Sequence, residues 1–433
     1  MNKPINELVL AVYSAVMWCA QPFVRRKMAR RGRAEPGYLV NIEERFGRYA
    51  QPAVQNPTQD QKFVWIHAVS LGETRAAAVL IAALRDHLPG MKLLLTHGTA
   101  TGRAEGEKLL RTGDVQVWQA WDAAAATERF VQHFQPRLGI MMETELWPNM
   151  AATCAKHHVP LVMANARMSD KSYVQTKKFD GLARPAYASL TAVWPQSAAD
   201  AERFEKLGAP VAGVFGNLKF DALVDLAQLA VGKSWRLKTS KPVVMFASSR
   251  DGEELALLAY LQKTVANVQW LIVPRHPQRF DEVAALIEKH GFKVSKRSDW
   301  VDEPIALDAT DTKTIWLGDS LGEMALYYGM SDVALLGGSF EPLGGQNLIE
   351  AAACACPVVM GPSVFNFSEA AALAVQSGAA FAVDSMPQAV DAACTLVEGS
   401  DTLAKARTAA VQFANAHQGA AEKTAAAVVQ LLG

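Results

Sequence analysis

This sequence lacks several features that would each have assigned a class of protein at once. Its 433 residues hold only five cysteines, and these are scattered apart from the close pair Cys354 and Cys356. So few thiols suit a reducing compartment and provide no disulfide framework. A zinc framework needs four ligands at recognised spacings, and this pair has no second pair of ligands. We therefore expect no metal site and no cofactor.

Neither sign of charge is in excess. The 43 basic residues balance the 43 acidic ones, so no global charge favours nucleic acid as a partner. The chain also has neither a G-x-G-x-x-G dinucleotide fingerprint nor a Walker A loop. These absences make a phosphate group of a mononucleotide a better candidate ligand than NAD or ATP.

Long uninterrupted apolar runs are missing as well. The nearest, Leu8–Val24, is short for a membrane-spanning helix and is interrupted by Gln21 and Pro22. Six cations follow it within Arg25–Arg33, whereas a secretory signal would place cations before the apolar run. This order favours a cytoplasmic location for the following domain and attracts anionic lipid headgroups. The alternative is a buried N-terminal helix with a solvated basic face.

The sequence does contain a regular alternation of apolar β-type runs with helical stretches. The alternation occurs twice, with a looser pattern between Asp221 and Pro242, and a chain of this length suggests more than one domain. It predicts doubly wound parallel sheets, and so two Rossmann-like domains in tandem with a cleft where the strand ends face each other. Beyond the first strand, the expected strands are Lys92–Leu95, Val115–Trp118, Leu138–Met142, Pro160–Met163, Ala192–Trp194, Val243–Ala247, Trp270–Val273, Thr314–Leu317, Val333–Leu336 and Pro357–Met360.

The first strand leads into the main candidate for catalysis. An apolar run from Phe63 stops at Ser70, and an Ala/Leu-rich helix follows a glycine turn that carries Glu73. Ligands of open α/β sheets bind outside the carboxyl ends of the strands, so Glu73 is placed where chemistry is expected. The spacing of Ser70 and Glu73 equally fits a capping box, in which both side chains satisfy free N–H groups of the first helical turn.

Further charged residues follow other strands of the first half. Glu143 and Glu145 come directly after the strand that ends at Met142, and an ionised carboxylate is costly to bury, so both are expected to face a polar cleft. Glu145 could instead cap the next helix. Lys219 lies near the end of the domain and suits an anionic ligand, although a surface ion pair would explain it equally well.

The second half carries features that suit a phosphate group. Prolines flank Arg275 and His276 after a strand, which holds that loop extended, and a fixed arginine can bind phosphate in a bidentate pair. Two further strands lead through glycines into helices at 318–323 and 337–350, where backbone N–H groups can approach an anion. Glu350 is placed to accept hydrogen bonds from ribose hydroxyls.

Taken together, these segments resemble the 3-deoxy-D-manno-octulosonic acid (Kdo) transferases of glycosyltransferase family 30. The similarity runs in order over nearly the whole chain. It rests on Val69–Glu73, Met142–Asn149, Ala164–Arg167, Leu218–Asp221, Val273–Pro277, Gly318–Glu323, Gly344–Asn347 with Glu350, and Gly361–Pro362 with Phe365–Phe367.

The resemblance implies a GT-B fold, which is two Rossmann-like domains facing a central cleft, with an N-terminal anchor helix. It implies an inverting, metal-independent transfer of Kdo from CMP-Kdo to the lipid A precursor lipid IVA, at the cytoplasmic side of the inner membrane. The expected parts are an anchor with a basic stretch (1–34), an acceptor-binding domain (35–225) and a CMP-Kdo-binding domain (226–433). Whether the last helix, Leu403–Leu432, packs back on the acceptor-binding domain stays open.

The resemblance also gives roles to single residues. Glu73 matches the catalytic base of the family, and Glu143 and Lys219 match groups that stabilise the transition state. The residues that match contacts to CMP are Pro274, Arg275, Leu321, Gly322, Glu323, Asn347, Leu348, Ile349 and Glu350.

Two other classes of protein remain as alternatives. A sugar-nucleotide epimerase shares the two-domain architecture but needs no lipid acceptor, so the basic, apolar N-terminus argues against it. A non-catalytic lipid-binding protein would explain residues 1–33 but not the paired glycine turns of the second half.

Overall fold

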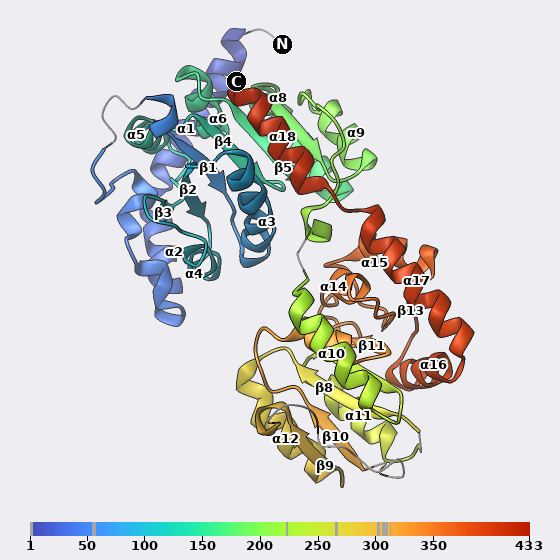
Figure 1. Cartoon of the computed structure of the whole chain (residues 1–433). Helices are drawn as coiled ribbons and strands as arrows, with labels where there is room; N and C mark the ends of the chain where they lie inside the picture. Colours follow the sequence, from blue (N-terminus) through green and yellow to red (C-terminus); the bar gives the residue numbers. More distant parts are fainter. Residues whose placement is uncertain are drawn as a thin grey trace. The chain divides into compact units, whose positions relative to one another are not determined.

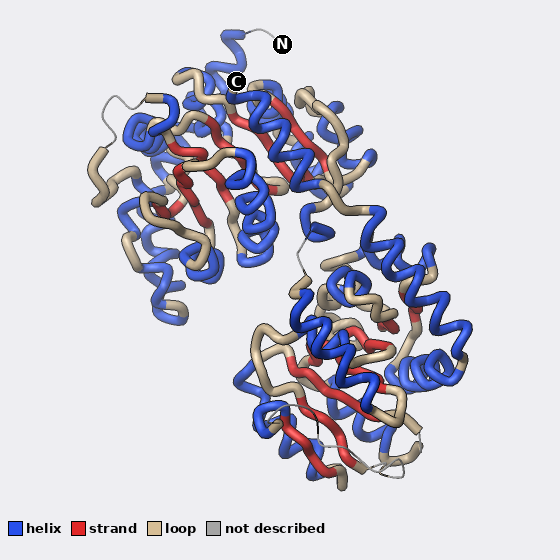
Figure 2. Tube along the Cα trace, viewed as in Figure 1, coloured by secondary structure: helices blue, strands red, loops and turns tan. Residues whose placement is uncertain are grey.

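Two parallel sheets organise this computed structural model, which describes residues 3–53, 58–221, 224–264, 267–300, 304, 311 and 313–433. The chain divides into two compact units (Figure 1). The first unit comprises Met1–Asp221 and Gln418–Gly433, and the second comprises Ala222–His417. In both units the strands are flanked by helices (Figure 2), as expected for doubly wound α/β domains.

The first unit is built on a six-stranded sheet in the order β3-β2-β1-β4-β5-β6, with every pair parallel. Ile66 of β1 lies opposite Leu95 of β2 and Ile140 of β4, so β1 and β4 are neighbours at the centre. The strands are β1 (Phe63–His67), β2 (Lys92–His97), β3 (Val115–Trp118), β4 (Leu138–Met142), β5 (Leu161–Ala166) and β6 (Ala192–Pro195).

Helices cover both faces of this sheet, so its central strands are buried throughout. The face that carries Trp65 is covered by α5, α6, α8 and α9. The face that carries Ile66 is covered by α3 and α18. The helices of the unit are α1 (Lys3–Cys19), α2 (Gln21–Ala34), α3 (Leu71–His87), α4 (Ala100–Glu107), α5 (Ala124–Phe134), α6 (Pro148–Lys156), α7 (Asp170–Lys177), α8 (Asp180–Ala188), α9 (Ala198–Lys206) and α18 (Ala420–Leu432), with 3-10 turns η1 (Pro36–Leu39), η2 (Ile42–Phe46), η3 (Gln59–Gln61) and η4 (Leu218–Asp221).

The second unit is built on a seven-stranded parallel sheet in the order β13-β12-β11-β7-β8-β10-β9. Its strands are β7 (Val243–Ser249), β8 (Gln269–Pro274), β9 (Lys293–Lys296), β10 (Thr314–Leu317), β11 (Val333–Leu336), β12 (Val358–Met360) and β13 (Ala380–Ala382). Its helices are α10 (Leu226–Lys238), α11 (Glu253–Leu261), α12 (Phe280–Lys289), α13 (Met324–Gly329), α14 (Leu348–Ala353), α15 (Ser368–Ser377), α16 (Met386–Glu398) and α17 (Ser400–Ala416), with η5 (Pro277–Arg279) and η6 (Arg297–Asp299). α11, α12 and α16 pack on one face of the sheet.

The N-terminal segment differs from the single anchor helix that the sequence suggests. It forms two helices, α1 and α2, that meet at Ala20 with a bend of 47°. In the part of the chain that the structure describes, no single helix is long and apolar enough to cross a bilayer, and this bent pair meets that criterion only jointly.

The C-terminal segment also differs from its expected form, because 403–432 is not one helix. α17 ends at Ala416 in the second unit, and α18 begins at Ala420 in the first, where it packs against α3 and η4. The Asp221 carboxylate accepts hydrogen bonds from the N–H groups of Gly419 (2.5 Å) and Ala421 (2.6 Å). A side chain distant in sequence therefore caps α18.

Replacing Asp221 with alanine should weaken the attachment of α18 by about 1 kcal/mol, since loss of a helix cap typically costs that much. Limited proteolysis would then cleave more rapidly around Gly419. Gln430→Ala is the control, because Gln430 is an exposed residue of the same helix. Equal cleavage of the parent and Asp221→Ala would contradict the capping role.

Candidate functional site

The strand order of the first unit places its candidate site at a topological switch point. From β1 the chain proceeds outward to β2 and β3, and then returns to β4 on the other side of β1. In open α/β sheets, ligands bind outside the carboxyl ends of the strands at such a point. Glu73 follows β1 and Glu143 follows β4, so both carboxyl groups lie at this position.

Glu73 takes part in a helix cap, as its spacing from Ser70 suggests. The Ser70 hydroxyl accepts a hydrogen bond from the Glu73 N–H (3.3 Å) and donates one to Glu73 Oε1 (3.0 Å). Glu73 Oε2 accepts a further hydrogen bond from the Val69 N–H (2.8 Å). The box therefore extends back to the residue before the N-cap, and it holds the carboxyl group in one orientation at the end of β1.

The cap does not keep this carboxyl group fully ionised at neutral pH. Burial raises the pKa of Glu73 to about 7, and the negative charges of Glu143 and Glu145 also favour the protonated form. The hydrogen bonds from Val69 and Ser70 act in the opposite direction, but burial outweighs them. A carboxyl group that titrates near neutral pH can both accept and release a proton.

Glu143 occupies an unusual backbone conformation at the end of β4. Its φ angle is +58°, in the left-handed region that non-glycine residues seldom adopt. Its N–H donates to the Ala164 carbonyl (3.1 Å), and its own carbonyl accepts from the Arg167 N–H (3.2 Å), so β5 holds it there. Burial raises the pKa of nearby Glu145. Strained residues of this kind cluster at functional sites.

Lys219 lies on η4, which packs against α3, the helix that carries Glu73. The Asn165 side chain fixes this turn, because its Oδ1 accepts a hydrogen bond from the Leu218 N–H (3.0 Å). Asn165 follows the same pattern as Glu143, with a φ angle of +52° near the end of β5. The structure thus places Lys219 beside the helix whose first turn holds Glu73.

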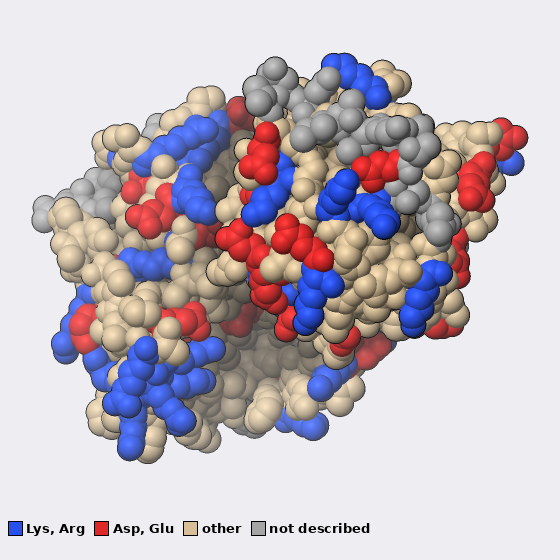
Figure 3. All heavy atoms as spheres, turned by 90° about the horizontal axis from the view of Figure 1, so that it is seen from below, with Lys and Arg blue, Asp and Glu red and all other residues tan. Residues whose placement is uncertain are grey.

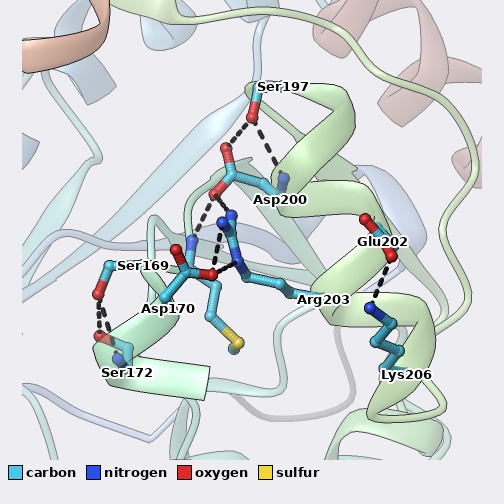
Figure 4. A network of polar contacts seen from close by, with 9 residues as sticks. Ser169, Asp170, Ser172, Ser197, Asp200, Glu202, Arg203 and Lys206 are labelled. Atoms are coloured by element: carbon cyan, nitrogen blue, oxygen red, sulfur yellow. Dashed lines mark hydrogen bonds and ion pairs between the residues drawn. The ribbon is translucent and has the colours of Figure 1, made fainter. Parts of the chain in front are cut away.

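A polar network holds the loop that follows β5 (Figure 4). Asp200 is buried and accepts hydrogen bonds from the Met168 N–H (2.7 Å) and the Ser197 hydroxyl (2.5 Å). Arg203 lies between Asp200 (3.9 Å) and Asp170 (2.7 Å). The network joins the start of α7 to α9. Its charged groups therefore fix the conformation of the loop.

In the second unit, Pro274 ends β8 and Arg275 follows it, as expected from the sequence. The Arg275 N–H donates to the Ser249 carbonyl (3.0 Å), and its Nε donates to Gln346 Oε1 (3.2 Å). This second contact links the β8 loop to the glycine-rich loop after β11. The structure therefore brings two of the predicted donor-binding segments together.

The 347–350 segment presents polar atoms at only some of its positions. Asn347 caps α14, because its Oδ1 accepts a hydrogen bond from the Ile349 N–H (3.1 Å). The Leu348 and Ile349 side chains are buried in the core, so only their backbone atoms are available to a ligand. Glu350 is half-buried, and its charge helps to raise the pKa of Tyr328 above its usual range.

The 321–323 segment after β10 is the most exposed of the three. Leu321 is 70% exposed, and Gly322 has a φ angle of +81°, which favours glycine. Glu323 forms an ion pair with Arg297 (2.9 Å) and a hydrogen bond with Ser320. This carboxylate is therefore engaged within the unit, and a donor would meet it as part of a charge pair.

Sequence reasoning missed Arg250 and the buried carboxyl groups beside it. Arg250 directly follows β7, and Glu253 and Glu254 begin α11 with almost no exposed surface. The available signal was a cation three positions after the predicted strand Val243–Ala247, similar to the signal that identified Arg275 two positions after Trp270–Val273. Among the described residues, no group of three or more His, Cys, Asp or Glu side chains is arranged to hold a metal ion.

The raised pKa of Glu73 predicts a pH-dependent stability. In the unfolded chain Glu73 ionises above about pH 4.5, whereas in the folded protein it ionises only near pH 7. Between these pH values the folded protein binds the proton more tightly than the unfolded chain, so the free energy of unfolding decreases as pH rises. Glu73→Gln should therefore be more stable than the parent at pH 8, on the order of 2 kcal/mol, and similar to it near pH 4.5. Urea unfolding at both pH values measures the difference, with exposed Glu107→Gln as the control. A difference that does not depend on pH would contradict the raised pKa.

Comparison with known proteins identifies the family. The family model described as 3-deoxy-D-manno-octulosonic-acid transferase (kdotransferase) matches residues 40–222. The chain is 40% identical to the 3-deoxy-D-manno-octulosonic acid transferase of Bordetella pertussis over 98% of this chain and 99% of that protein.

A glycosyltransferase of Rickettsia africae ESF-5 (13% identity, TM-score 0.54, covering 86% of this chain and 98% of that one) shows a similar fold. So does a UDP-GlcNAc 2-epimerase of Neisseria meningitidis (12% identity, TM-score 0.55, covering 85% and 99%). These two likenesses support the GT-B fold alone. The identity to the Bordetella protein over nearly all of both chains shows that this chain belongs to the Kdo transferase family.

Proposed function

We propose that this chain is an inverting, metal-independent glycosyltransferase that moves Kdo from CMP-Kdo to lipid IVA, with Glu73 as the general base. The observation that carries this proposal is a carboxyl group with a pKa of about 7, held in a fixed orientation at the switch point of the first sheet. A general base is most effective when its pKa lies near the working pH.

The reaction needs one displacement. An acceptor hydroxyl attacks the anomeric carbon of Kdo, and its proton passes to Glu73 as the new carbon–oxygen bond forms. The bond between that carbon and the phosphate oxygen breaks, and CMP leaves with the electron pair. Because a single attack from the face opposite the leaving group inverts the centre, no covalent intermediate on the protein is required.

The other predicted residues are assigned to the charges of this step. In the proposal, Lys219 and Glu143 stabilise charge that develops as the bonds change, and Arg275 holds the CMP phosphate. The hydrogen bond between Arg275 and Gln346 supports the role of Arg275 in holding the phosphate, since preorganised groups lose little orientational entropy when a ligand binds. The nucleoside is proposed to contact Asn347, which lies directly before α14, and Glu350, which lies in its first turn.

Removing the base should slow transfer without abolishing binding of the donor. Glu73→Gln is expected to lower kcat by about 10²- to 10⁴-fold, because general-base catalysis is generally worth that much. The product is measured by mass after incubation with CMP-Kdo and lipid IVA, and CMP binding is measured separately. Glu107→Gln controls for the loss of an acidic side chain elsewhere.

The pH dependence of the parent supplies a second readout. As the ionised form of Glu73 is the base, kcat/KM should rise with pH and level off above an apparent pKa near 7. Equal rates for the parent and Glu73→Gln would show that Glu73 only caps α3, and would direct the search to Glu143 and Glu145. No transfer by the parent itself would contradict the proposed reaction.

We also propose that α1 and α2 lie in the membrane interface, at the cytoplasmic side of the inner membrane. α1 exposes Leu8, Val12 and Val16, spaced four residues apart, and apolar side chains continue with Trp18 and with Phe23 of α2. Helical spacing places the first three on one face, as in helices that lie on a bilayer.

The opposite side of α1 is attached to the protein. Tyr13 donates a hydrogen bond to Asp122 (2.9 Å), Ser14 donates one to Asn149 (2.6 Å), and the Met17 carbonyl accepts one from Trp121. A spanning arrangement would have to break these contacts. Figure 3 shows a dense cluster of Lys and Arg side chains on the left side, where Figure 1 places α2, and such a cluster attracts anionic headgroups.

Replacing Val12, Val16 and Trp18 with serine should weaken binding to phosphatidylglycerol-rich vesicles at least about tenfold, since burial of each side chain in the interface contributes apolar stabilisation. Sedimentation with vesicles measures the loss. Leu237→Ser is the control, because Leu237 is 88% exposed but lies on α10. Parent protein that resists extraction from membranes by alkaline wash would contradict interfacial binding and favour a spanning segment.

A further inference from the structure

The second sheet has its own topological switch point, and Arg250 lies there. The chain passes from β7 to β8, β9 and β10 on one side, and then returns to β11 on the other side of β7. Arg250 follows β7, and the glycine-rich loop at 337–347 follows β11. Both segments therefore lie at the edge of the sheet where ligands bind in such folds.

Arg250 is held rigidly against the glycine-rich loop by one buried carboxylate. Glu253 is 1% exposed and accepts three backbone hydrogen bonds, from Arg250 (2.9 Å), Gly338 (2.8 Å) and Phe340 (3.0 Å). A carboxylate that joins both segments in this way fixes the backbone of Arg250 relative to Gly338. The position of the arginine is thus set before any ligand arrives.

The Arg250 guanidinium has no partner among the residues that the structure describes. It is half-buried, and it makes neither a hydrogen bond nor an ion pair there. The carboxylates next to it in sequence contact other groups: Glu253 accepts from backbone N–H groups, Glu254 Oε1 contacts Ser249 and Arg279, and Asp251 pairs with Arg279. A fixed, unpaired cation of this kind is suited to an anion from outside the chain.

Arg250 lies close to the predicted phosphate-binding arginine. A Cβ atom placed on Gly338 would lie 3.7 Å from Arg250 Cγ and 3.2 Å from Gln346 Nε2, so Arg250 and Gln346 flank the same glycine. Gln346 in turn accepts a hydrogen bond from Arg275. The pKa of His276 is lowered by burial and then by the charges of Arg250 and Arg275, which places both cations near one ring.

The proposed donor carries two anionic groups, the phosphodiester of CMP and the carboxylate of the ulosonic acid. Arg275 is assigned to the phosphate, which leaves the second cation without a role. We propose that Arg250 binds the carboxylate of the Kdo residue in the donor, and so selects acidic sugar nucleotides over neutral ones. This inference rests on the proposed function of the chain. A planar guanidinium matches a carboxylate through two parallel hydrogen bonds, which lysine cannot reproduce.

The test compares a ligand with the carboxylate and one without it. In Arg250→Gln, affinity for CMP-Kdo should fall about 10- to 100-fold, as expected for loss of a charge-assisted pair, while affinity for CMP changes less than about twofold. Arg250→Lys should recover only part of the loss. Arg275→Gln should weaken both ligands, and Lys289→Gln, which removes an exposed cation of the same unit, should weaken neither.

The outcomes separate this inference from the proposed function. Equal loss of CMP and CMP-Kdo in Arg250→Gln would assign Arg250 to the phosphate, and unchanged affinity for both would leave it without a role in donor binding; either result overturns the inference. Kdo transfer by the parent, measured independently, would still uphold the proposed function in both cases.

Discussion

The burial of the Glu73 carboxyl group at the end of β1 is the constraint on which this account depends. Burial raises its pKa to about 7, while the cap with Val69 and Ser70 holds its orientation. The strand order makes β4 the neighbour of β1, and so brings Glu143 to the same edge. A helix cap and a general base are therefore compatible roles here, because the cap fixes the group whose proton affinity burial has raised.

Both units place charged side chains at the switch point of their sheets, and these charges are opposite in sign. At the switch point of the first sheet, the structure places the carboxyl groups of Glu73 and Glu143 after β1 and β4. At that of the second sheet, it places Arg250 and Gly338 after β7 and β11, with Arg275 after β8. Acidic groups suit the removal of a proton from an acceptor, and cations suit an anionic donor. The division of charge between units agrees with the division of roles that we propose.

Much of the sheet architecture could be predicted from sequence, because its central strands are buried on both faces and appear as continuous apolar runs. Val115–Trp118, Leu138–Met142 and Val333–Leu336 have the predicted bounds. The strands that were missed are edge strands. β9 reads Lys-Val-Ser-Lys and has no apolar run, and β13 reads Ala-Phe-Ala and is too short, at three residues, to be recognised as a strand.

Tertiary contacts account for the other differences. The break between α17 and α18 has a local signal in Gly419, whose φ angle is +98°, but the capping of α18 by Asp221, nearly two hundred positions earlier in the sequence, is not readable from the local pattern. The role of Arg250 likewise depends on Glu253, whose hydrogen bonds join two loops. Glu73 and Arg275 could be predicted because each lies in a segment that leads out of an apolar strand, whereas the raised pKa of Glu73 depends on packing.

The most direct test of this account is a titration of Glu73 itself, followed by NMR of protein labelled with ¹³C at the glutamate carboxyl carbons. Comparison with Glu73→Gln identifies its signal. We expect this signal to titrate near pH 7, and to move toward lower pH when the charges of Glu143 and Glu145 are removed together. Titration near pH 4.5, the ordinary value for a glutamate, would contradict the central claim that burial prepares Glu73 to act as a base.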